Sequence, residues 1–577
     1  MTFYRLFAAL CALALASCAA MPPPDTAQSA APPVTEAQAE TLVQPFVIAA
    51  NPLAARAGME VFERGGSAAD AAVAVQAMLS LVEPQSSGMG GGTFINYYNA
   101  AEESVVIYDG REVAPAQASR TMFLDADGEP IGFRDAVVSG RATGVPGAVA
   151  ALAMVHEAHG SLPWSQLFGS AIATADEGFI VSPRLGRFLT IDFPQLSVPD
   201  ADSYFSRPDG TRLQIGDRLR NPDYADFLRR LAANGPDALY RGETAARIVE
   251  RTRQGPLGGT MTMADLANYR PVVREPVCRP WQGYRVCVPP PPSSGVGFLQ
   301  LLGLLDRTDI AERGPDDPQA WYLFAEASRL MYADRDRYVG DVPTVPIDGM
   351  LDPAYLDSRA ALIGPRSAEN VVAGTPPGAS ETVTDMTREP AGTSHFIVRD
   401  AQGNVISMTT TVESIFGTGR MVDGFFLNNQ LTDFSFNPYQ ADGSLAPNAV
   451  ARGKRPRSSM IPLIMVDGEG AFAGAIGSAG GNSILAYVGK SLVGAVLWGL
   501  PMQDALALPN LVARSNRIGG EVGDFDPAIV EGLAERGIDL EPGQGEDSGV
   551  HAVIIRDGGR VDGGYDPRRE GAVLVGE

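Results

Sequence analysis

The order of helix-like and strand-like segments constrains the fold of this chain more than any other feature of its sequence. Residues 51–84 have apolar side chains three and four positions apart, and residues 145–370 alternate helical runs with Pro-rich loops. The segments "TFINYYN" and "SVVIYDG" are strand-like, and after Thr393 short alternating strands such as "HFIVRD" and "AFAGAIG" predominate. Helices that flank antiparallel strands predict a layered α+β protein.

The composition limits the partners that the protein can bind. The chain has 577 residues, of which 45% are hydrophobic and 20% charged, as is typical of a soluble globular protein with a large core. A net charge of −23 repels nucleic-acid phosphates, so we expect no nucleic-acid partner. The apolar run Asn482–Leu500 contains Lys490 and several Gly, which favours a packed core helix over a membrane span.

The first residues predict export. Residues 1–17 have one early Arg and a short apolar run, which is typical of a secretory signal peptide. The ending "LASC" resembles a bacterial lipobox and implies a lipoprotein-type signal with lipidation of Cys18; an ordinary signal peptide cut near Ala20 is the alternative. Residues 18–44 are rich in Pro and Ala and predict a flexible tether. We expect the protein in the periplasm or as a membrane-anchored lipoprotein of a bacterium, with the membrane contacted only through that anchor.

Two cysteines remain outside the signal, in the segment "CRPWQGYRVC". If Gln282 and Gly283 form the two-residue turn of a β-hairpin, Cys278 faces Cys287 at cross-strand bonding distance. In an exported protein this arrangement predicts a disulfide, with two buried thiols as the alternative. We expect no metal site, because no nearby His completes a ligand set.

The sequence lacks the common signatures of hydrolases and nucleotide-binding enzymes. No HExxH, Walker A or GxSxG motif occurs, and "GMGGG" near Gly88 lacks the Lys-Ser/Thr that a phosphate loop requires. Of the four histidines, we expect His156 and His159 to lie on the surface of a helix. A Ser-His-Asp enzyme would have to use His395 or His551, with no motif in support.

Thr393 lies where the polar loop "REPAG" meets the strand-like segment "SHFIV". A Thr hydroxyl is a poor nucleophile at neutral pH unless a base takes its proton. Cleavage of the Gly392–Thr393 bond would give Thr393 a free α-amino group, whose pKa of about 7.7–8.0 suits general-base catalysis. Gly392 has no Cβ to block the approach of the Thr393 hydroxyl to the preceding carbonyl group. We infer that the loop is cut and that the strand holds the new amino terminus.

Several longer motifs surround this boundary. From Gly392 onward they are "GTSHFIVRDAQGNVISMTTTVESIFGTG", "GFFLNNQLTDFS", "GKRPRSSMIP" and "IGSAGGNSI", and "DPRR" lies near the end. Upstream they are "EPQSSGMGGGTF", "YDGREVAPAQAS", "GVPGAVAAL" and "PPPPSSG". Together they resemble the γ-glutamyltransferase (glutathione hydrolase) family of N-terminal nucleophile hydrolases, over nearly all of the chain from about residue 45.

The resemblance implies a catalytic role for matching residues. Thr393 matches the nucleophile and, with Gly392, the processing site. Thr411, in "TTTVES", matches the residue that hydrogen-bonds to the nucleophile and orients it. Gly480 and Gly481, in "SAGGN", match the pair whose amides form the oxyanion hole, where glycines leave the donors unobstructed.

The resemblance also implies a pocket for the amino acid end of a substrate. Arg111, in "DGREVAP", matches a clamp on the α-carboxylate, because a guanidinium fork fits two carboxylate oxygens. The other matching residues are two hydroxyl donors and two acceptors for the α-ammonium: Ser458, Ser459, Gln430 and Asp433. Glu413 is a departure, since many members have Asn there. Glu413 would share the ammonium with Asp433 and favour a charged amino acid end; alternatively it points to solvent from a strand.

The fold implied by the resemblance is a four-layer αββα sandwich, made as one precursor that cuts itself. The large subunit, residues 45–392, and the small catalytic subunit, residues 393–577, would stay packed as one domain around a shared core. Thr393 would take the γ-glutamyl group of glutathione or a similar amide and pass it to water, an amino acid or a peptide. No metal or organic cofactor is needed.

Three alternatives remain open from the sequence. A cephalosporin (glutaryl) acylase would keep the fold and change the substrate. A conventional Ser hydrolase would depend on His395 or His551. A non-catalytic lipoprotein binding module would stay uncut, and it would run as one band on a denaturing gel where the cut enzyme runs as two.

Overall fold

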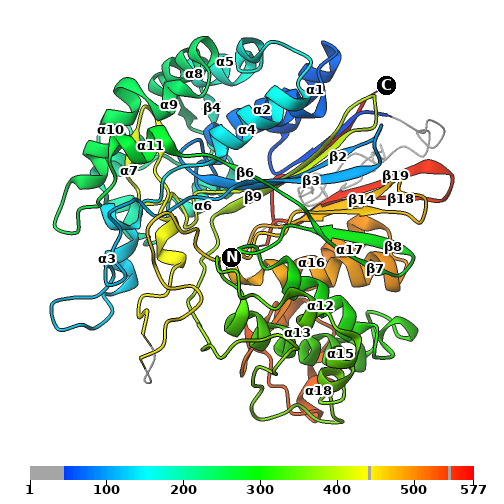
Figure 1. Ribbon diagram of the computed structural model, residues 1–577. Helices are drawn as coiled ribbons and strands as arrows, with labels where there is room; N and C mark the ends of the chain where they lie inside the picture. The colour runs from blue at the N-terminus through cyan, green and yellow to red at the C-terminus, as the bar shows by residue number, and fades with distance from the viewer. Residues whose placement is uncertain (1–43, 440–442, 544–547, 577) are drawn as a thin grey trace, which may run out of the picture. The chain divides into compact units, whose positions relative to one another are not determined.

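Two antiparallel β-sheets form the centre of the computed structural model, which describes residues 44–439, 443–543 and 548–576 (Figure 1). The first sheet has the strand order β20–β1–β9–β10–β2–β3–β6. Its strands, in that order, are Ala572–Val575, Phe46–Ala49, Thr393–Arg399, Val405–Thr411, Gly92–Asn99, Ser104–Gly110 and Val272–Arg274. The second sheet has the order β19–β18–β14–β13–β8–β7. Its strands are Arg560–Tyr565, His551–Arg556, Phe472–Gly477, Leu463–Val466, Tyr284–Val288 and Val277–Trp281.

Helices cover the outer face of each sheet (Figure 1). On the first sheet these helices include α1 (Pro52–Glu63), α2 (Ala68–Val82) and α4 (Ala148–His159). On the second sheet they include α12 (Gly295–Leu305), α16 (Ile484–Leu492) and α17 (Met502–Ala507), with α13 (Pro318–Tyr338) packed on α12. The layers are therefore helix, sheet, sheet and helix, which confirms the predicted αββα sandwich.

The helical pattern over residues 51–84 forms two helices and not one. Helix α1 ends at Glu63, and α2 begins after Ser67, whose hydroxyl accepts a hydrogen bond from the Asp70 amide. The Asp70 carboxylate in turn accepts one from the Ser67 amide at 2.8 Å. This reciprocal capping box satisfies amide groups that a helix leaves unpaired at its start.

The side chains of β9 alternate between two hydrophobic clusters. Phe396 and Val398 pack with α1 and α2, whereas Ile397 belongs to the cluster that fills the space between the sheets. His395 lies on the same side as Ile397, because a Cβ at Gly477 of the second sheet would lie 2.4 Å from its ring. The period of two therefore turns Thr393, at the start of β9, toward the second sheet.

Strands from both sides of residue 392 alternate within the first sheet. Strand β1 pairs with β20 on one side and with β9 on the other, so that Phe46 faces both Val575 and Arg399. The second sheet likewise combines strands from before and after residue 392, since Ile464 of β13 faces Cys287 of β8. The segments before and after residue 392 thus share both sheets and the core between them.

The hairpin of β7 and β8 has the register that a two-residue turn predicts. Trp281 faces Tyr284, and Cys278 faces Cys287 with the two Cα atoms 4.1 Å apart. A disulfide joins the two cysteines. This bond ties an edge strand of the second sheet to its neighbour.

The prediction that His156 and His159 are surface residues is wrong, although both do lie on a helix. His156 is half-buried, with Nε2 located 3.3 Å from a carboxylate oxygen of Asp70. His159 is half-buried and stacks on Tyr97 with ring centroids 3.9 Å apart. Both imidazoles have partners in the packing of α4 against its neighbours, which the helical pattern alone does not reveal.

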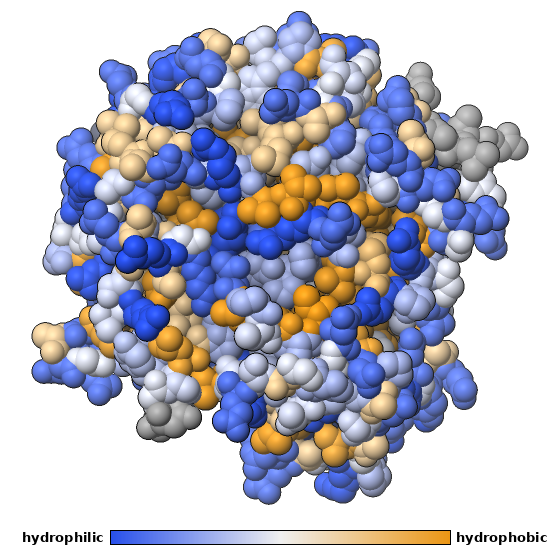
Figure 2. All heavy atoms as spheres, viewed as in Figure 1, coloured by the Kyte–Doolittle hydropathy of each residue, from blue (hydrophilic) through white to orange (hydrophobic). Residues whose placement is uncertain are grey.

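The apolar run Asn482–Leu500 is packed in the core, as predicted, but its α-helix is shorter than the run. Helix α16 ends at Leu492 and continues as one turn of π-helix over Val493–Leu497. Within the described residues, no helix is long and apolar enough to cross a membrane. On the face shown in Figure 2, hydrophobic side chains gather over the region where the sheet edges lie in Figure 1, and hydrophilic side chains surround them.

Candidate active site

The site lies at the paired ends of two neighbouring strands of the first sheet, next to the loop that precedes β9. Thr393, the first residue of β9, lies directly opposite Thr411, the last residue of β10. The Thr393 hydroxyl donates a hydrogen bond to Oγ1 of Thr411 at 3.1 Å, and that hydroxyl donates to the carbonyl oxygen of Gly392 at 2.8 Å. The amide of Glu413 also donates to Oγ1 of Thr411, at 2.7 Å. One hydroxyl group therefore links Thr393 with the carbonyl of the peptide bond that precedes it.

Gly392 fits this loop because it has no side chain. A Cβ at Gly392 would lie 2.2 Å from the carbonyl oxygen of Glu413 and 2.4 Å from the carbonyl carbon of Ser414. Real Cβ atoms do not approach backbone atoms so closely, so any other residue would push the loop away from β10. The glycine thus holds the Gly392 carbonyl within reach of Thr411.

A small cavity of about 20 Å³ lies beside Thr393. Its walls are Arg111, Glu389, Pro390, Thr393, Thr411, Glu413, Gln430, Asp433, Ser458, Ser459, Met460, Gly481 and Ile484. The wall includes every residue predicted to bind substrate and three of the four predicted catalytic residues. Gly480 is not among them, although it directly precedes Gly481.

The glycine pair lies at the turn between β14 and α16. Gly480 has a φ of 131° and Gly481 a φ of 54°, values that favour glycine. In the described part of the chain, neither amide donates a hydrogen bond to a protein group. A cluster of free amides at such a turn can accept a developing negative charge.

Asp433 is the central acceptor at one end of the cavity. Its Oδ2 atom accepts hydrogen bonds from Nη2 of Arg111 and Nε2 of Gln430, each at 2.6 Å. Gln430 and Asp433 lie on one short 3₁₀-helix, Gln430–Asp433, which places both side chains on the same wall. Arg111 donates further bonds to the carbonyl oxygens of Pro456 at 3.2 Å and Arg457 at 2.6 Å.

Glu413 is buried in this wall, so the alternative that it points to solvent is wrong. It follows the end of β10 with a φ of 83°, and its carboxylate accepts hydrogen bonds from Ser414 at 2.6 Å and from Asn429. The carboxyl groups of Glu413 and Asp433 line the same cavity. Burial, reinforced by the neighbouring Asp433 charge, raises the pKa of Glu413, and burial raises the pKa of Asp433 despite the nearby Arg111. Burial therefore favours the protonated form of Glu413.

Three ionic side chains of the site were not predicted from the sequence. The carboxylate of Glu389, four residues before Thr393, accepts hydrogen bonds from Arg335, from Nε of Arg457 at 3.3 Å and from the Ser459 amide at 2.9 Å. Burial alone would raise the pKa of Glu389, but the two guanidinium groups outweigh it and lower the pKa to about 2. Arg457 lies within the quoted motif "GKRPRSSMIP", directly before Ser458. Arg335 lies on α13, where no local pattern marks it.

A fourth carboxyl group of the site, after those of Asp433, Glu413 and Glu389, lies next to Arg111. Glu112 is fully buried, and its Oε2 atom is 3.8 Å from Nη1 of Arg111. Neither of its side-chain oxygens has a hydrogen-bond partner among the described residues. Burial raises the pKa of Glu112 to about 8, so this group is mainly protonated at neutral pH.

Neither His395 nor His551 lines the cavity. Nδ1 of His395 lies 2.8 Å from the Thr409 hydroxyl, and Nδ1 of His551 lies 3.1 Å from the carbonyl oxygen of Gly549. Burial lowers the pKa of both rings, that of His551 to about 3. Two buried, uncharged imidazoles away from the cavity do not support a Ser-His hydrolase mechanism there.

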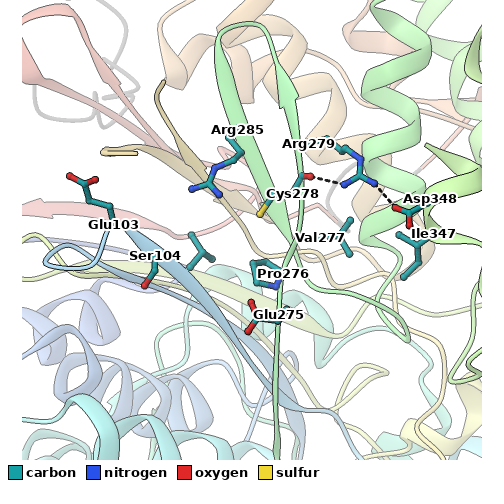
Figure 3. Close-up of a pocket in the computed structure, with 11 residues that line it drawn as sticks. Glu103, Ser104, Glu275, Pro276, Val277, Cys278, Arg279, Arg285, Ile347 and Asp348 are labelled. Carbon is teal, nitrogen blue, oxygen red and sulfur yellow. Dashed lines mark hydrogen bonds and ion pairs between the residues drawn. The ribbon is translucent and has the colours of Figure 1, made fainter. Parts of the chain in front are cut away.

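A second cavity lies elsewhere on the surface. The cavity in Figure 3, between the β7–β8 hairpin and the turn after β2, is lined by side chains such as Glu103, Arg279 and Arg285. Arg279 there is paired with Asp348 at 2.8 Å. Across the described ranges, no cluster of three or more His, Cys, Asp or Glu side chains could hold a metal ion.

Known proteins are similar to this chain in sequence and in fold. A model of the family described as Gamma-glutamyltranspeptidase matches residues 54–576. The chain is 36% identical over 483 residues to the glutathione hydrolase proenzyme of Bacillus subtilis (strain 168), covering 82% of this chain and 81% of that protein. It is 32% identical over 544 residues to the acylase ACY 1 proenzyme of Pseudomonas sp. (strain SE83), with 92% and 93% covered. The solved structure of a cephalosporin acylase from Bacillus halodurans has a TM-score of 0.81 at 25% identity, covering 95% of this chain and 98% of that one.

The family match covers the cavity beside Thr393 and every strand of the two sheets except β1, because it begins within α1 and ends after β20. The similar proteins include two proenzymes that are named as hydrolase and acylase. The chain therefore belongs to the γ-glutamyltranspeptidase family of enzymes.

Proposed function

We propose that this chain is a precursor that cuts itself between Gly392 and Thr393 and then acts as a glutathione hydrolase or γ-glutamyltransferase. The observation that carries the proposal is the hydroxyl of Thr411, which bonds to both Thr393 and the Gly392 carbonyl at the edge of a cavity with acidic and basic walls. A hydroxyl donor on that carbonyl oxygen can stabilise the charge that develops when Thr393 attacks.

In the processing step, Oγ1 of Thr393 attacks the carbonyl carbon of Gly392. The peptide C–N bond breaks, the nitrogen takes up the hydroxyl proton, and an ester joins Gly392 to the Thr393 side chain. Water then hydrolyses the ester and leaves a carboxylate on Gly392 and a free α-amino group on Thr393. The products are the large subunit, residues 45–392, and the small subunit, residues 393–577, which remain one domain because they share both sheets.

In the catalytic step, the α-amino group of Thr393 takes the proton of its own hydroxyl, which attacks the γ-glutamyl amide. The amides of Gly480 and Gly481 stabilise the tetrahedral intermediate, and the departing amine takes the proton. The resulting γ-glutamyl ester on Thr393 is resolved by water, or by the amino group of an amino acid or peptide. The steps use side chains, an amine and water, so no cofactor takes part.

The acidic end of the cavity supports recognition of an α-ammonium group. Asp433 and Glu413 each have one buried oxygen without a hydrogen-bond donor among the described residues. An ammonium group can donate three hydrogen bonds and would satisfy both oxygens while it neutralises the pair. A γ-glutamyl donor carries such a group, and a glutaryl donor does not.

Mass analysis of the purified protein tests the proposal directly. We expect a small fragment that begins at Thr393, and hydrolysis of γ-glutamyl-p-nitroanilide by the cut protein. Thr393→Ala should remain one chain without activity, whereas Thr393→Ser, which retains a hydroxyl nucleophile, should still be cut. An uncut but active wild type, or a Thr393→Ala variant that matures and hydrolyses the anilide, would overturn the mechanism.

A glutaryl acylase is the second candidate, favoured by the fold and sequence shared with the cephalosporin acylase and with acylase ACY 1. The two activities differ in whether the acyl group carries an α-amino group. The ratio of kcat/KM for γ-glutamyl-p-nitroanilide to that for glutaryl-p-nitroanilide separates them. We expect the γ-glutamyl compound to be the better substrate, and the opposite ratio would favour the acylase.

The proposed location is outside the cytoplasm, with the mature chain attached to a bacterial membrane through Cys18. That residue and the tether to residue 43 lie outside the described residues. Replacement of Cys18 by Ser should release the protein from the membrane fraction and abolish its labelling by a radioactive fatty acid. Retention of the variant in the membrane fraction would contradict lipidation at this position.

A further inference from the structure

A buried ion cluster lies behind Thr393, on the face of β9 that turns away from the cavity. The Ser394 hydroxyl donates a hydrogen bond to a carboxylate oxygen of Glu83 at 3.2 Å. Because side chains alternate along a strand, Ser394 lies on the same face as Phe396, which packs with α1 and α2. Ser394 and Glu83 are each only 1% exposed, and neither lines the cavity. This contact therefore reaches the strand from outside the site described above.

Two arginines hold the Glu83 carboxylate in place. Nη1 of Arg184 lies 3.3 Å from Oε1 of Glu83, and Nη1 of Arg569 lies 3.6 Å from Oε2. Both guanidinium groups also donate to the Ser86 hydroxyl at 3.3 Å. Both arginine side chains are buried, so a rotation of the carboxylate would leave charges unpaired away from water, which is strongly unfavourable. Glu83 is therefore a fixed acceptor for Ser394.

The turn that begins at Glu83 also holds the end of β10. The Ser86 amide donates to the Glu83 carbonyl at 2.9 Å, and the Ser86 carbonyl accepts a hydrogen bond from the Val412 amide at 3.4 Å. Val412 directly follows Thr411, the residue that bonds to the Thr393 hydroxyl. The cluster thus contacts both strands that carry the threonine pair.

Arg569 connects the cluster with the segment that precedes the glycine turn. Its Nε atom donates to the Ser548 carbonyl at 2.8 Å. A Cβ at the next residue, Gly549, would lie 2.7 Å from that Nε atom, so the guanidinium group packs directly on this backbone. The Gly549 carbonyl accepts a hydrogen bond from the Ala479 amide at 3.4 Å, and Ala479 directly precedes the glycine pair. One buried cluster therefore contacts the strand of Thr393 and the support of the glycine amides.

Cleavage would make the Ser394 contact more important. In the uncut chain, peptide bonds hold Thr393 on both sides, to Gly392 and to Ser394. In the cut chain Thr393 is the terminal residue, and only its pairing with β10 and its bond to Ser394 hold it. A misplacement of about 1 Å can reduce a reaction rate about 100-fold. A fixed partner for the side chain of Ser394 would limit such movement of Thr393.

We propose that Glu83 is a positioning residue, which fixes Thr393 through Ser394 and the glycine turn through Arg569. The inference rests on the proposed function, because it takes Thr393 as the nucleophile and the glycine amides as the donors to the oxyanion. Glu83 and Ser394 lie outside the cavity wall and act through Thr393. Loss of their contact should therefore slow the chemical step and leave donor binding unchanged.

Ser394→Ala tests this role, because it removes one hydroxyl group and leaves the ion pairs in place. On the cut enzyme with γ-glutamyl-p-nitroanilide, kcat should fall by about 10- to 100-fold. KM should stay within about threefold of wild type, since the cavity wall is unchanged. Self-cleavage should also slow, because it uses the same hydroxyl of Thr393. If the variant is cut too slowly to yield enzyme, the rate at which the full-length band disappears measures the same effect.

Ser407→Ala is the matched control. Ser407 lies on the neighbouring strand β10 and is fully buried, and its hydroxyl has no hydrogen-bond partner among the described residues. This change removes the same atom from the same sheet and should leave kcat, KM and the cleavage rate within about threefold of wild type. Equal losses in both variants would mean that packing of the sheet, and not the bond to Glu83, controls the rate.

A double-mutant cycle separates positioning from a general loss of stability. Glu83→Ala should lower kcat at least as much as Ser394→Ala, because it also removes a carboxylate from Arg569. In the Glu83→Ala background, Ser394→Ala should lower kcat less than about threefold further, since the hydroxyl has already lost this acceptor. The same loss in both backgrounds would overturn the proposal. If Glu83→Ala does not fold, the comparison of Ser394→Ala with Ser407→Ala decides the question alone.

The outcomes distinguish this inference from the proposed function. If the wild type hydrolyses the γ-glutamyl donor while Ser394→Ala keeps the full kcat, or changes KM alone, only the positioning role is wrong. A wild type that stays uncut and inactive would overturn the proposed function and this inference with it. If the wild type prefers the glutaryl compound, the proposed donor is wrong, and the same variants compared on glutaryl-p-nitroanilide test the positioning role.

Discussion

The hydroxyl oxygens of Thr393 and Thr411 lie 3.1 Å apart across the paired ends of β9 and β10. Since the Thr411 hydroxyl also donates to the Gly392 carbonyl, Thr411→Val should slow self-cleavage by about 100- to 1,000-fold, the usual effect of losing a donor to a developing oxyanion. The rate at which the full-length band disappears on a denaturing gel measures this effect. Thr411→Ser keeps the hydroxyl and should restore most of the rate.

Thr410→Val is the matched control for that prediction. Thr410 lies in the same strand, is fully buried, and its hydroxyl has no hydrogen-bond partner among the described residues. The change to Val keeps the shape and should leave the cleavage rate within about threefold of wild type. Equal slowing by both Val variants would mean that strand packing, and not the Thr411 hydroxyl, controls processing.

Gly392→Ala should prevent cleavage. The added methyl group would lie 2.2 Å from the Glu413 carbonyl oxygen, so the loop must move and the Gly392 carbonyl leaves Thr411. We expect a full-length protein that binds neither substrate nor product, and a lower melting temperature by calorimetry. Gly314→Ala, where a Cβ meets nothing within 4 Å, should mature at the wild-type rate. Normal cleavage of Gly392→Ala would show that the loop is not fixed by this contact.

Glu413→Gln should weaken the binding of donors that carry an α-ammonium group. Loss of one charged acceptor should raise KM for γ-glutamyl-p-nitroanilide by about 10-fold or more, while KM for glutaryl-p-nitroanilide stays nearly constant. Glu102→Gln, on the exposed turn after β2, should change neither value. Equal effects on both donors would place Glu413 outside ammonium recognition.

The same variant should change the pH dependence of KM. Burial raises the pKa of Glu413 and Asp433, and we expect the empty pair to hold a proton that an incoming ammonium group displaces. Binding of the donor therefore releases a proton in the wild type, and KM should fall as the pH rises from 5 to 8, by up to about tenfold for each pH unit. In Glu413→Gln this slope should flatten, and parallel profiles for the two proteins would contradict the expected proton on the empty pair.

Glu389→Gln should destabilise the uncut chain. In a Thr393→Ala background, which keeps the precursor intact, removal of the buried charge should lower the free energy of unfolding by about 3–5 kcal/mol at neutral pH. The pKa of Glu389 is lowered from 4.5 to about 2, so the advantage of Glu over Gln is complete above pH 4.5 and disappears as the pH falls toward 2. Denaturant titrations at several pH values measure the difference. Glu381→Gln changes an exposed residue in the same segment before Thr393 and should leave the free energy of unfolding unchanged. An equal loss there would contradict the role of the ion pairs.

Local patterns were sufficient to predict the parts of the fold that depend on neighbouring residues. The alternation of β9 predicts its two faces, and the Gln282–Gly283 turn predicts that Cys278 faces Cys287. The resemblance adds the predicted catalytic and substrate-binding residues, and the structure places all of these except Gly480 in the wall of one small cavity. Glu413 and Asp433, which the resemblance predicts to share the ammonium group, both line this cavity.

Contacts between distant segments could not be predicted in the same way. Glu389 accepts a hydrogen bond from Arg335, 54 positions earlier, because α13 and the segment before Thr393 pack together. Neither segment has a pattern that indicates the other. The burial of His156 likewise depends on Asp70 at the start of α2. In each case a long-range ion pair determines the environment of a side chain, and only the tertiary structure reveals the partner.

Strand β1, which lies between β20 and β9, has a consequence for the cut protein. Neither fragment can leave without breaking a row of backbone hydrogen bonds on each edge of that strand and exposing the core between the sheets. Dilution should therefore not separate the two fragments, and a cut molecule should not exchange its fragments with another. Once unfolded, the two fragments would have to associate in solution before they refold. Scission should therefore leave the folded state stable and make its recovery slow.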